Sequence, residues 1–107
     1  MGTILHYSIV VTCWDKKRVE AAHAFAVNTG ASVTNVIGPV TNGFHSFLVG
    51  PDGSKYGWDE QKAGQLRRDE IVAHLVENGV EYVEVQHGET YAGAAVMRSN
   101  CHNDSDT

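Results

Sequence analysis

The sequence predicts one α+β domain in the order strand, helix, strand, strand, helix, strand. Residues 5–13 and 81–87 alternate apolar and polar side chains, which is the period of a half-buried strand. Between them, residues 16–29 and 60–78 carry apolar side chains at helical spacing. An Asn-Gly pair at 42–43 separates two further apolar runs and is typical of a β-hairpin turn.

The first strand has one apolar face and one mixed face. We expect the odd-numbered residues to point toward the core and the even-numbered residues to point away from it. The inward set is Leu5, Tyr7, Ile9, Val11 and Cys13, and the outward set is His6, Ser8, Val10 and Thr12.

Asp15 is the predicted N-cap of the first helix, which continues to about Thr29 and ends at Gly30. Small and apolar residues recur along one side of this helix, so that side can lie close to a sheet. The predicted apolar stripe is Val19, Ala22, Phe25 and Ala26.

The predicted hairpin joins a strand at 33–41 to a strand at 44–49. With a two-residue turn, Gly38 would face Phe47 and Val36 would face Val49. Pro39 has no amide hydrogen to donate, so the strand that contains it should lie at a sheet edge.

The second half of the chain repeats the helix-strand layout. After a turn at 50–54, a helix is predicted from residue 60 or 61 to Asn78, with Ile71, Val72, Leu75 and Val76 on its core face. The next strand is predicted at 81–87, followed by a further strand at 91–98 and a flexible polar tail at 99–107. In the strand at 81–87 we expect Val83 and Val85 to point inward, and Tyr82, Glu84 and Gln86 to point outward.

This element order predicts a ferredoxin-like fold over residues 1–98. Right-handed crossovers place the strands in the order 4-1-3-2, with both helices on one face of an antiparallel sheet. The second strand is then an edge strand, in agreement with the position of Pro39. The other face of the sheet is left open and available for a partner.

The bulk composition bounds the class of protein. The chain has 107 residues and a formal net charge of −5, and it shows no basic stripe of the kind that nucleic-acid binding usually requires. No apolar run is long enough to span a bilayer, and the first residues do not form a signal peptide, so no membrane partner is expected. Cys13 and Cys101 do not suggest a disulfide framework, which favours a cytoplasmic location.

No catalytic, metal or nucleotide motif is present, and no cofactor is expected. The candidate catalytic residues are three histidines on predicted strands, His6, His45 and His87, any of which could act as acid or base. A metal site would require at least three of His6, His45, His87, Cys101 and His102 to converge, and the sequence alone predicts none.

The candidate binding residues are aromatic loop residues and outward strand residues. Large aromatic side chains next to glycines in a connecting loop are common partner contacts, although they can also close the end of a core. These candidates are Tyr56, Trp58, Trp14, Glu84 and Gln86.

In element order and length, residues 5–87 resemble two broad groups of proteins with this layout. One group contains small homodimeric α+β-barrel proteins, some of them enzymes, and the other contains small bacterial or phage accessory proteins that act by binding. The first hypothesis is therefore a non-catalytic, self-associating protein that regulates or inhibits a host protein. The alternative is a small homodimeric enzyme that binds a small molecule and uses a histidine beside Tyr7, Tyr82 or Glu84.

Overall fold

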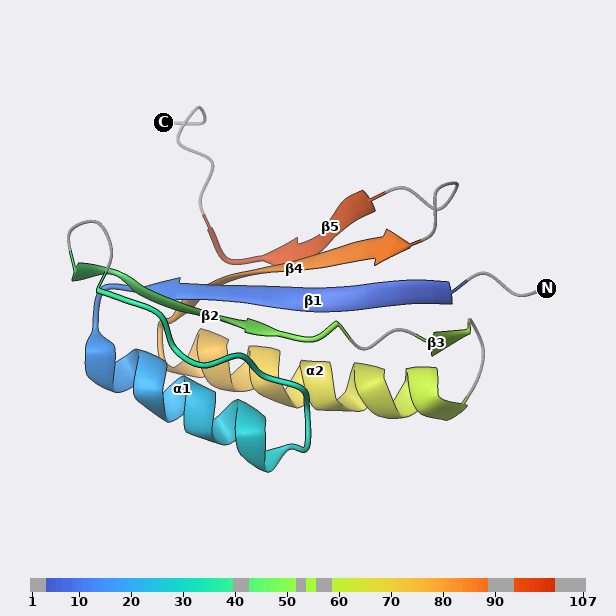
Figure 1. Ribbon diagram of the computed structural model, residues 1–107, viewed down its shortest axis with the longest axis horizontal. Coiled ribbons are helices and arrows are strands. Elements are labelled where there is room, and N and C mark those ends of the chain that lie inside the picture. Colours follow the sequence, from blue (N-terminus) through green and yellow to red (C-terminus); the bar gives the residue numbers. More distant parts are fainter. Residues whose placement is uncertain (1–3, 40–42, 52–53, 56–58, 89–93, 102–107) are drawn as a thin grey trace.

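The computed structural model describes residues 4–39, 43–51, 54–55, 59–88 and 94–101. It is an α+β structure with two helices and an antiparallel sheet (Figure 1). The elements in chain order are β1 (Ile4–Cys13), α1 (Lys16–Asn28), β2 (His45–Val49), β3 (Ser54–Lys55), α2 (Asp59–Glu77), β4 (Glu81–Gly88) and β5 (Ala94–Ser99).

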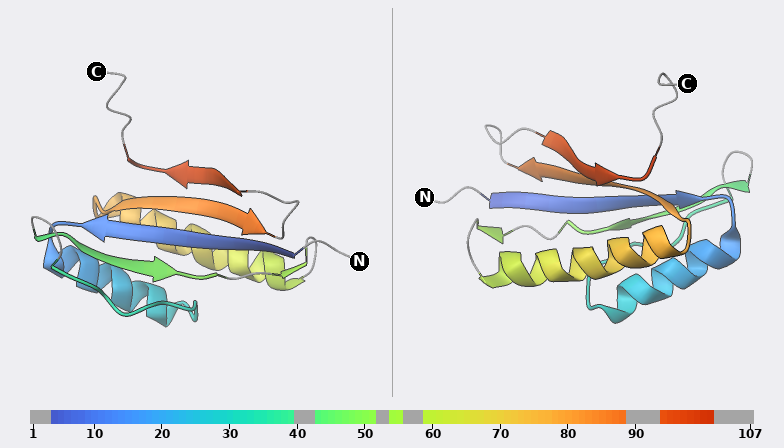
Figure 2. Two further views of the ribbon diagram at one scale, coloured as in Figure 1. Left: turned by 45° about the horizontal axis from the view of Figure 1, so that its top comes forward. Right: turned by 180° about the vertical axis from the view of Figure 1, so that it is seen from behind.

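The strand order is β2-β1-β4-β5, and β3 pairs with the start of β1 on the same edge as β2. Both helices lie on one face of the sheet (Figure 1), and none of the described segments covers the other face (Figure 2). We call these the helix face and the open face. The additional C-terminal strand predicted from the sequence is present as β5.

The core lies between the helix face and the two helices. Of the residues of β1 predicted to point inward, Ile9, Val11 and Cys13 are buried in it, as predicted. The remaining core side chains come from both helices, β2, β4 and the residue before β4, and together they form one cluster. These are Val19, Ala22, Ala26, Phe47, Val49, Ile71, Val72, Leu75, Val80 and Tyr82.

Both helices begin and pack much as predicted. The Asp15 carboxylate accepts hydrogen bonds from the backbone amides of Lys17 and Arg18, at 3.0 and 3.4 Å, and so caps α1. On α2, the residues predicted for the core face are buried with one exception. That exception is Val76, which is exposed, so its assignment was wrong.

The predicted strand at 33–41 is reduced to two isolated bridges along the outer edge of β2. The bridges pair Val33 with Val49 and Ile37 with Ser46, so the register expected for a two-residue turn was wrong. Gly38 explains part of the irregularity: its φ is +127°, and a Cβ there would lie 2.7 Å from the carbonyl oxygen of Phe44. Residues 40–42 of the predicted turn lie outside the described part.

The predicted orientation of β4 was wrong. Tyr82 and Glu84 are buried on the helix face, whereas Val83 and Val85 lie on the open face and are partly exposed. The register explains this, because Tyr82 lies opposite Val11 and Glu84 lies opposite Ile9, and both partners are core residues.

Hydrogen bonding to β4 continues beyond β5. The Asn100 side chain accepts from the amide of Tyr82 and donates to the carbonyl of Val80, both at 2.8 Å, and the Cys101 thiol lies 3.7 Å from the Tyr82 carbonyl. The described chain is therefore tied to the sheet as far as Cys101, within the segment predicted to be a tail. Among the described helices, none is long and apolar enough to cross a membrane.

Candidate functional site

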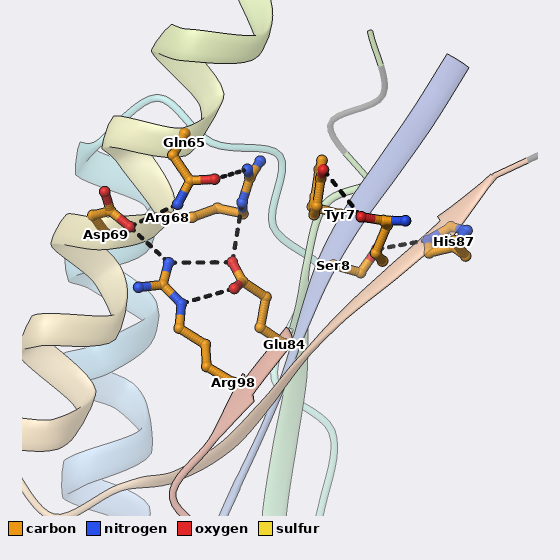
Figure 3. A network of polar contacts seen from close by, with 9 residues as sticks. Tyr7, Ser8, Gln65, Arg68, Asp69, Glu84, His87 and Arg98 are labelled. Carbon is orange, nitrogen blue, oxygen red and sulfur yellow. Dashed lines mark hydrogen bonds and ion pairs between the residues drawn. The ribbon is translucent and has the colours of Figure 1, made fainter. Parts of the chain in front are cut away.

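Two polar clusters lie on opposite faces of the sheet, and Figure 3 shows the first together with Ser8 and His87 of the second face. The first, which we call the interior network, lies between α2 and the strands β4 and β5. The second is the histidine pair of the open face, His6 and His87.

The interior network is centred on the Glu84 carboxylate. Arg68 of α2 donates to Glu84 Oε2 at 3.0 Å, and Arg98 of β5 donates to Oε1 at 2.7 Å. Arg98 also donates to Asp69 at 2.8 Å. Gln65 accepts a hydrogen bond from Arg68 at 2.8 Å and donates to Asp69 at the same distance. The side chains of Arg68 and Glu84 are only 3% and 4% exposed.

Tyr7 extends the interior network toward β1. The Arg68 guanidinium carbon lies 4.1 Å from the centroid of the Tyr7 ring, which is a cation–π contact. The Tyr7 hydroxyl donates to Gln86 at 3.2 Å. Arg68 is therefore held both by a carboxylate and by an aromatic face, and the network joins α2 to three strands.

The charges of the interior network compensate one another. Burial by itself would lower the pKa of Arg98, but its hydrogen bonds to Glu84 and Asp69 outweigh burial and raise the pKa above its usual value. A buried carboxylate between two guanidinium groups is stable because both of its oxygens accept charge-assisted hydrogen bonds. Because Arg68 belongs to α2 and Glu84 to β4, their hydrogen bond fixes the position of α2 on the sheet.

The open face has a different composition. The alternation along β1 and its register with β2 and β4 determine which residues lie on this face. Among the described open-face positions of these three strands, Glu81 is the one charged side chain. Its members are His6, Ser8, Val10, Thr12, Ser46, Leu48, Glu81, Val83, Val85 and His87. Val96 of β5 continues the row, since it pairs with Val85.

His6 and His87 are direct cross-strand partners on β1 and β4. Their rings are stacked, with centroids 5.3 Å apart and an interplanar angle of 27°. The Nε2 atom of His87 lies 3.2 Å from the hydroxyl oxygen of Ser8, and the Nδ1 atom of His6 is buried without a hydrogen-bond partner in the described structure. The structure thus brings together two of the three candidate histidines.

The third candidate, His45, lies elsewhere. It is buried and pairs with Cys13, so it occupies the helix face at the far end of β1 from His6. Of the five possible metal ligands named from the sequence, Cys101 lies near Tyr82 and His102 is outside the described residues. Among the described residues, no three His, Cys, Asp or Glu side chains form a metal-binding group.

The candidate binding residues lie in different environments. Glu84 is buried in the interior network, and Gln86 is half-buried and bonded to Tyr7, so the prediction that both point outward was wrong. Trp14 is exposed just after β1. Tyr56 and Trp58 lie outside the described residues, and the prediction that they contact a partner stays untested.

For two of the three candidate histidines, the structure does not show the arrangement expected for the enzymatic alternative. His6 and His87 lie on the open face, whereas Tyr7, Tyr82 and Glu84 lie on the helix face, so β1 and β4 separate these groups. A shallow hollow of about 60 Å³ on the open face is lined by none of the candidate histidines. Its lining residues are Val10, Thr12, Glu81, Tyr82, Val83 and Cys101.

Sequence reasoning missed Arg68 and Arg98, although Arg68 carried a signal. It precedes Ile71 and Val72 by three and four residues and therefore lies on the core face of α2, where a charge requires a partner. No protein-family model matches this sequence, and no curated protein shows significant similarity to it.

Proposed function

We propose that this protein is a non-catalytic binding protein that self-associates through the open face of a ferredoxin-like sheet. The strand order supports the ferredoxin-like assignment when the bridged segment 33–37 is counted as a reduced second strand beside β2. The sheet then reads β4-β1-β2 followed by that segment, with β5 added beyond β4.

The observation that carries the proposal is that exposed apolar side chains lie on the open face among almost no charges. Val10 and Val96 are 41% and 64% exposed there, and Met97 at the bulge of β5 is also exposed. Large apolar side chains grouped on one exposed face, with few charges among them, are typical of an interaction surface.

A second copy of the chain is the partner that this face favours. The chain has a net charge of −5, yet the described open-face positions of β1, β2 and β4 contribute only Glu81 to it. Two copies can therefore approach face to face with little like-charge repulsion, in an isologous arrangement. A nucleic-acid partner would instead require basic residues on this face.

The experiment measures the mass of the untagged protein by light scattering across a concentration series. We expect a dimer for the wild type and a monomer for the double variant Val10→Lys/Val96→Lys, because charged side chains would be desolvated in the interface. The matched control is Val27→Lys/Val76→Lys, which adds the same charge at two exposed valines on the helices. We expect the control to remain dimeric.

Two results would contradict the proposal. One is a wild-type monomer at every concentration measured. The other is a control variant that dissociates as completely as the open-face variant, since the effect would then come from net charge. Circular dichroism spectra of both variants establish that each is folded.

The predicted contact between the loop residues and a further protein partner is tested separately. Trp58→Ala is expected to leave the fold intact and to weaken binding to a regulated protein once one is known. If Trp58→Ala unfolds the chain, the side chain belongs to the core and the loop is not the contact.

A further inference from the structure

The histidine pair of the open face has the separation of two metal ligands. His6 and His87 come from opposite ends of the chain, and the register of β1 with β4 places them directly opposite each other. A tetrahedral ion with metal–nitrogen bonds of about 2.0–2.1 Å holds two imidazole centroids about 5.2 Å apart. The observed separation is 5.3 Å, which matches this spacing.

The hydrogen bonds of the pair leave nitrogens available for an ion. His87 is oriented by Ser8, whose hydroxyl oxygen lies 3.2 Å from Nε2, and this leaves Nδ1 of His87 for coordination. A metal-ligating histidine normally donates its other ring N–H in this way. In His6, the Nδ1 atom is buried and has no hydrogen-bond partner among the described residues, which is costly for a polar atom unless something binds it.

We propose that His6 and His87 bind one divalent transition-metal ion of the Zn²⁺, Cu²⁺ or Ni²⁺ type. Imidazole nitrogen suits these ions, whereas Mg²⁺ and Ca²⁺ require oxygen ligands that the pair does not offer. The negative net charge of the chain also favours a bound cation.

The pair supplies two ligands, because no third His, Cys, Asp or Glu joins it among the described residues. In a single chain, water fills the remaining positions. In the face-to-face dimer, the histidine pair of the second copy fills them and gives a four-nitrogen tetrahedral site shared by both chains. This shared form rests on the homodimer proposed above, whereas binding by the pair does not.

Other unpaired histidine nitrogens do not form comparable sites. The Nδ1 atom of His45 and the Nε2 atom of His74 are also buried without partners in the described part of the chain. His74 stacks on Phe25, and His45 is paired in register with Cys13, itself a buried core residue. Neither lies beside a second histidine in the described structure, so the His6–His87 pair is the arrangement that fits an ion.

The test is isothermal titration of the untagged protein with ZnCl₂, repeated with CuCl₂ and NiCl₂. We expect saturable binding by the wild type. His6→Gln and His87→Gln should each weaken it at least about tenfold, the lower end of the loss seen when only a second-shell partner is removed. The matched control is His23→Gln, whose amide can replace the ring as a hydrogen-bond donor to the Thr34 carbonyl. A second control, Cys101→Ser/His102→Gln, removes the two candidate ligands near the C-terminal end.

Native mass spectrometry of the same samples separates this proposal from the homodimer. One ion per two chains supports the shared site, and one ion per chain supports binding by the pair but contradicts sharing. If the protein is a monomer that binds metal through the pair, the homodimer proposal is contradicted and the metal proposal stands. If the protein is a dimer that binds no metal, the metal proposal is contradicted and the homodimer proposal stands. The metal proposal is overturned if no saturable binding occurs, or if His6→Gln and His87→Gln bind as tightly as the wild type.

Discussion

The two faces of the sheet reverse the usual distribution of charge. The helix face contacts an interior network of two arginines and two carboxylates, whereas the open face shows valines, hydroxyl groups and a histidine pair. The buried charges of Arg68 and Glu84 are paired with each other. The open face is covered by neither helix (Figure 2). The comparison teaches that in this sheet pairing, rather than hydropathy, determines which side of β4 faces the core.

Removal of Arg68 should have the largest effect on stability. Arg68→Ala leaves Glu84 buried with only Arg98 as a charged partner and removes the cation–π contact with Tyr7. We expect the free energy of unfolding to fall by about 3 kcal/mol, the lower end of the cost of breaking a buried ion pair, because Arg98 still pairs with Glu84. Urea unfolding measures it, and Lys16→Ala in the exposed Lys16–Glu20 pair should cost below about 1 kcal/mol.

A double replacement sharpens this result. Arg68→Met/Glu84→Leu removes both charges of the buried pair, so it should recover most of the stability lost in Arg68→Ala. If Arg68→Ala costs no more than Lys16→Ala, the interior network does not fix α2 on the sheet.

On the open face, removal of the Ser8 hydroxyl should have an intermediate effect. Ser8→Ala removes the group that orients the His87 ring, and we expect metal affinity to fall about tenfold. Titration with ZnCl₂ measures the change, and Thr12→Val is the control because its hydroxyl contacts Ser46 instead. Equal affinity in Ser8→Ala and wild type would show that Ser8 does not orient His87.

The smallest effect concerns pH. Hydrogen bonds to Glu84 and Asp69 raise the pKa of Arg98 in the folded protein. The charged guanidinium therefore stabilises the fold fully below the pKa that Arg98 has in the unfolded chain, and this stabilisation is lost only when pH rises through the pKa in the folded protein. Wild-type stability from this group should therefore persist to pH ~10 and above. A lysine, with a pKa near ~10.4, loses its charge earlier.

The variant Arg98→Lys therefore allows the stabilisation by the charge at position 98 to be measured. The gap in unfolding free energy between the variant and the wild type should widen by up to about 1 kcal/mol between pH ~8 and ~11. Urea midpoints across this range measure the gap, and changes common to both proteins cancel. A gap that stays constant would mean that the charge at position 98 does not stabilise the fold.

Much of the fold could be predicted because the informative patterns were long. The alternation over β1 and the helical stripes involve many residues, and each had one consistent solution. The irregular path of residues 33–39 could not be predicted, since Gly38 adopts a positive φ and lies close to the Phe44 carbonyl, which no local pattern reveals.

The site was predicted less completely. In β4, two valines suggested the core side, whereas the register with Ile9 and Val11 placed Glu84 and Tyr82 there. Only the position of Arg68 on the core face of α2 could have signalled a buried carboxylate. The contact between His6 and His87 depends on strand pairing across the whole chain, which alternation in each strand does not specify.

The position of β1 at the centre of the sheet has a consequence for synthesis on the ribosome. β1 pairs with β4, and Ile9 lies opposite Glu84, so the central ladder joins residues from distant parts of the sequence. Contacts of this range close late, because a long loop must first be ordered. While the chain emerges, β1 therefore has an apolar face and an unpaired edge without its main partner, and this interval is when the nascent protein most needs protection from aggregation.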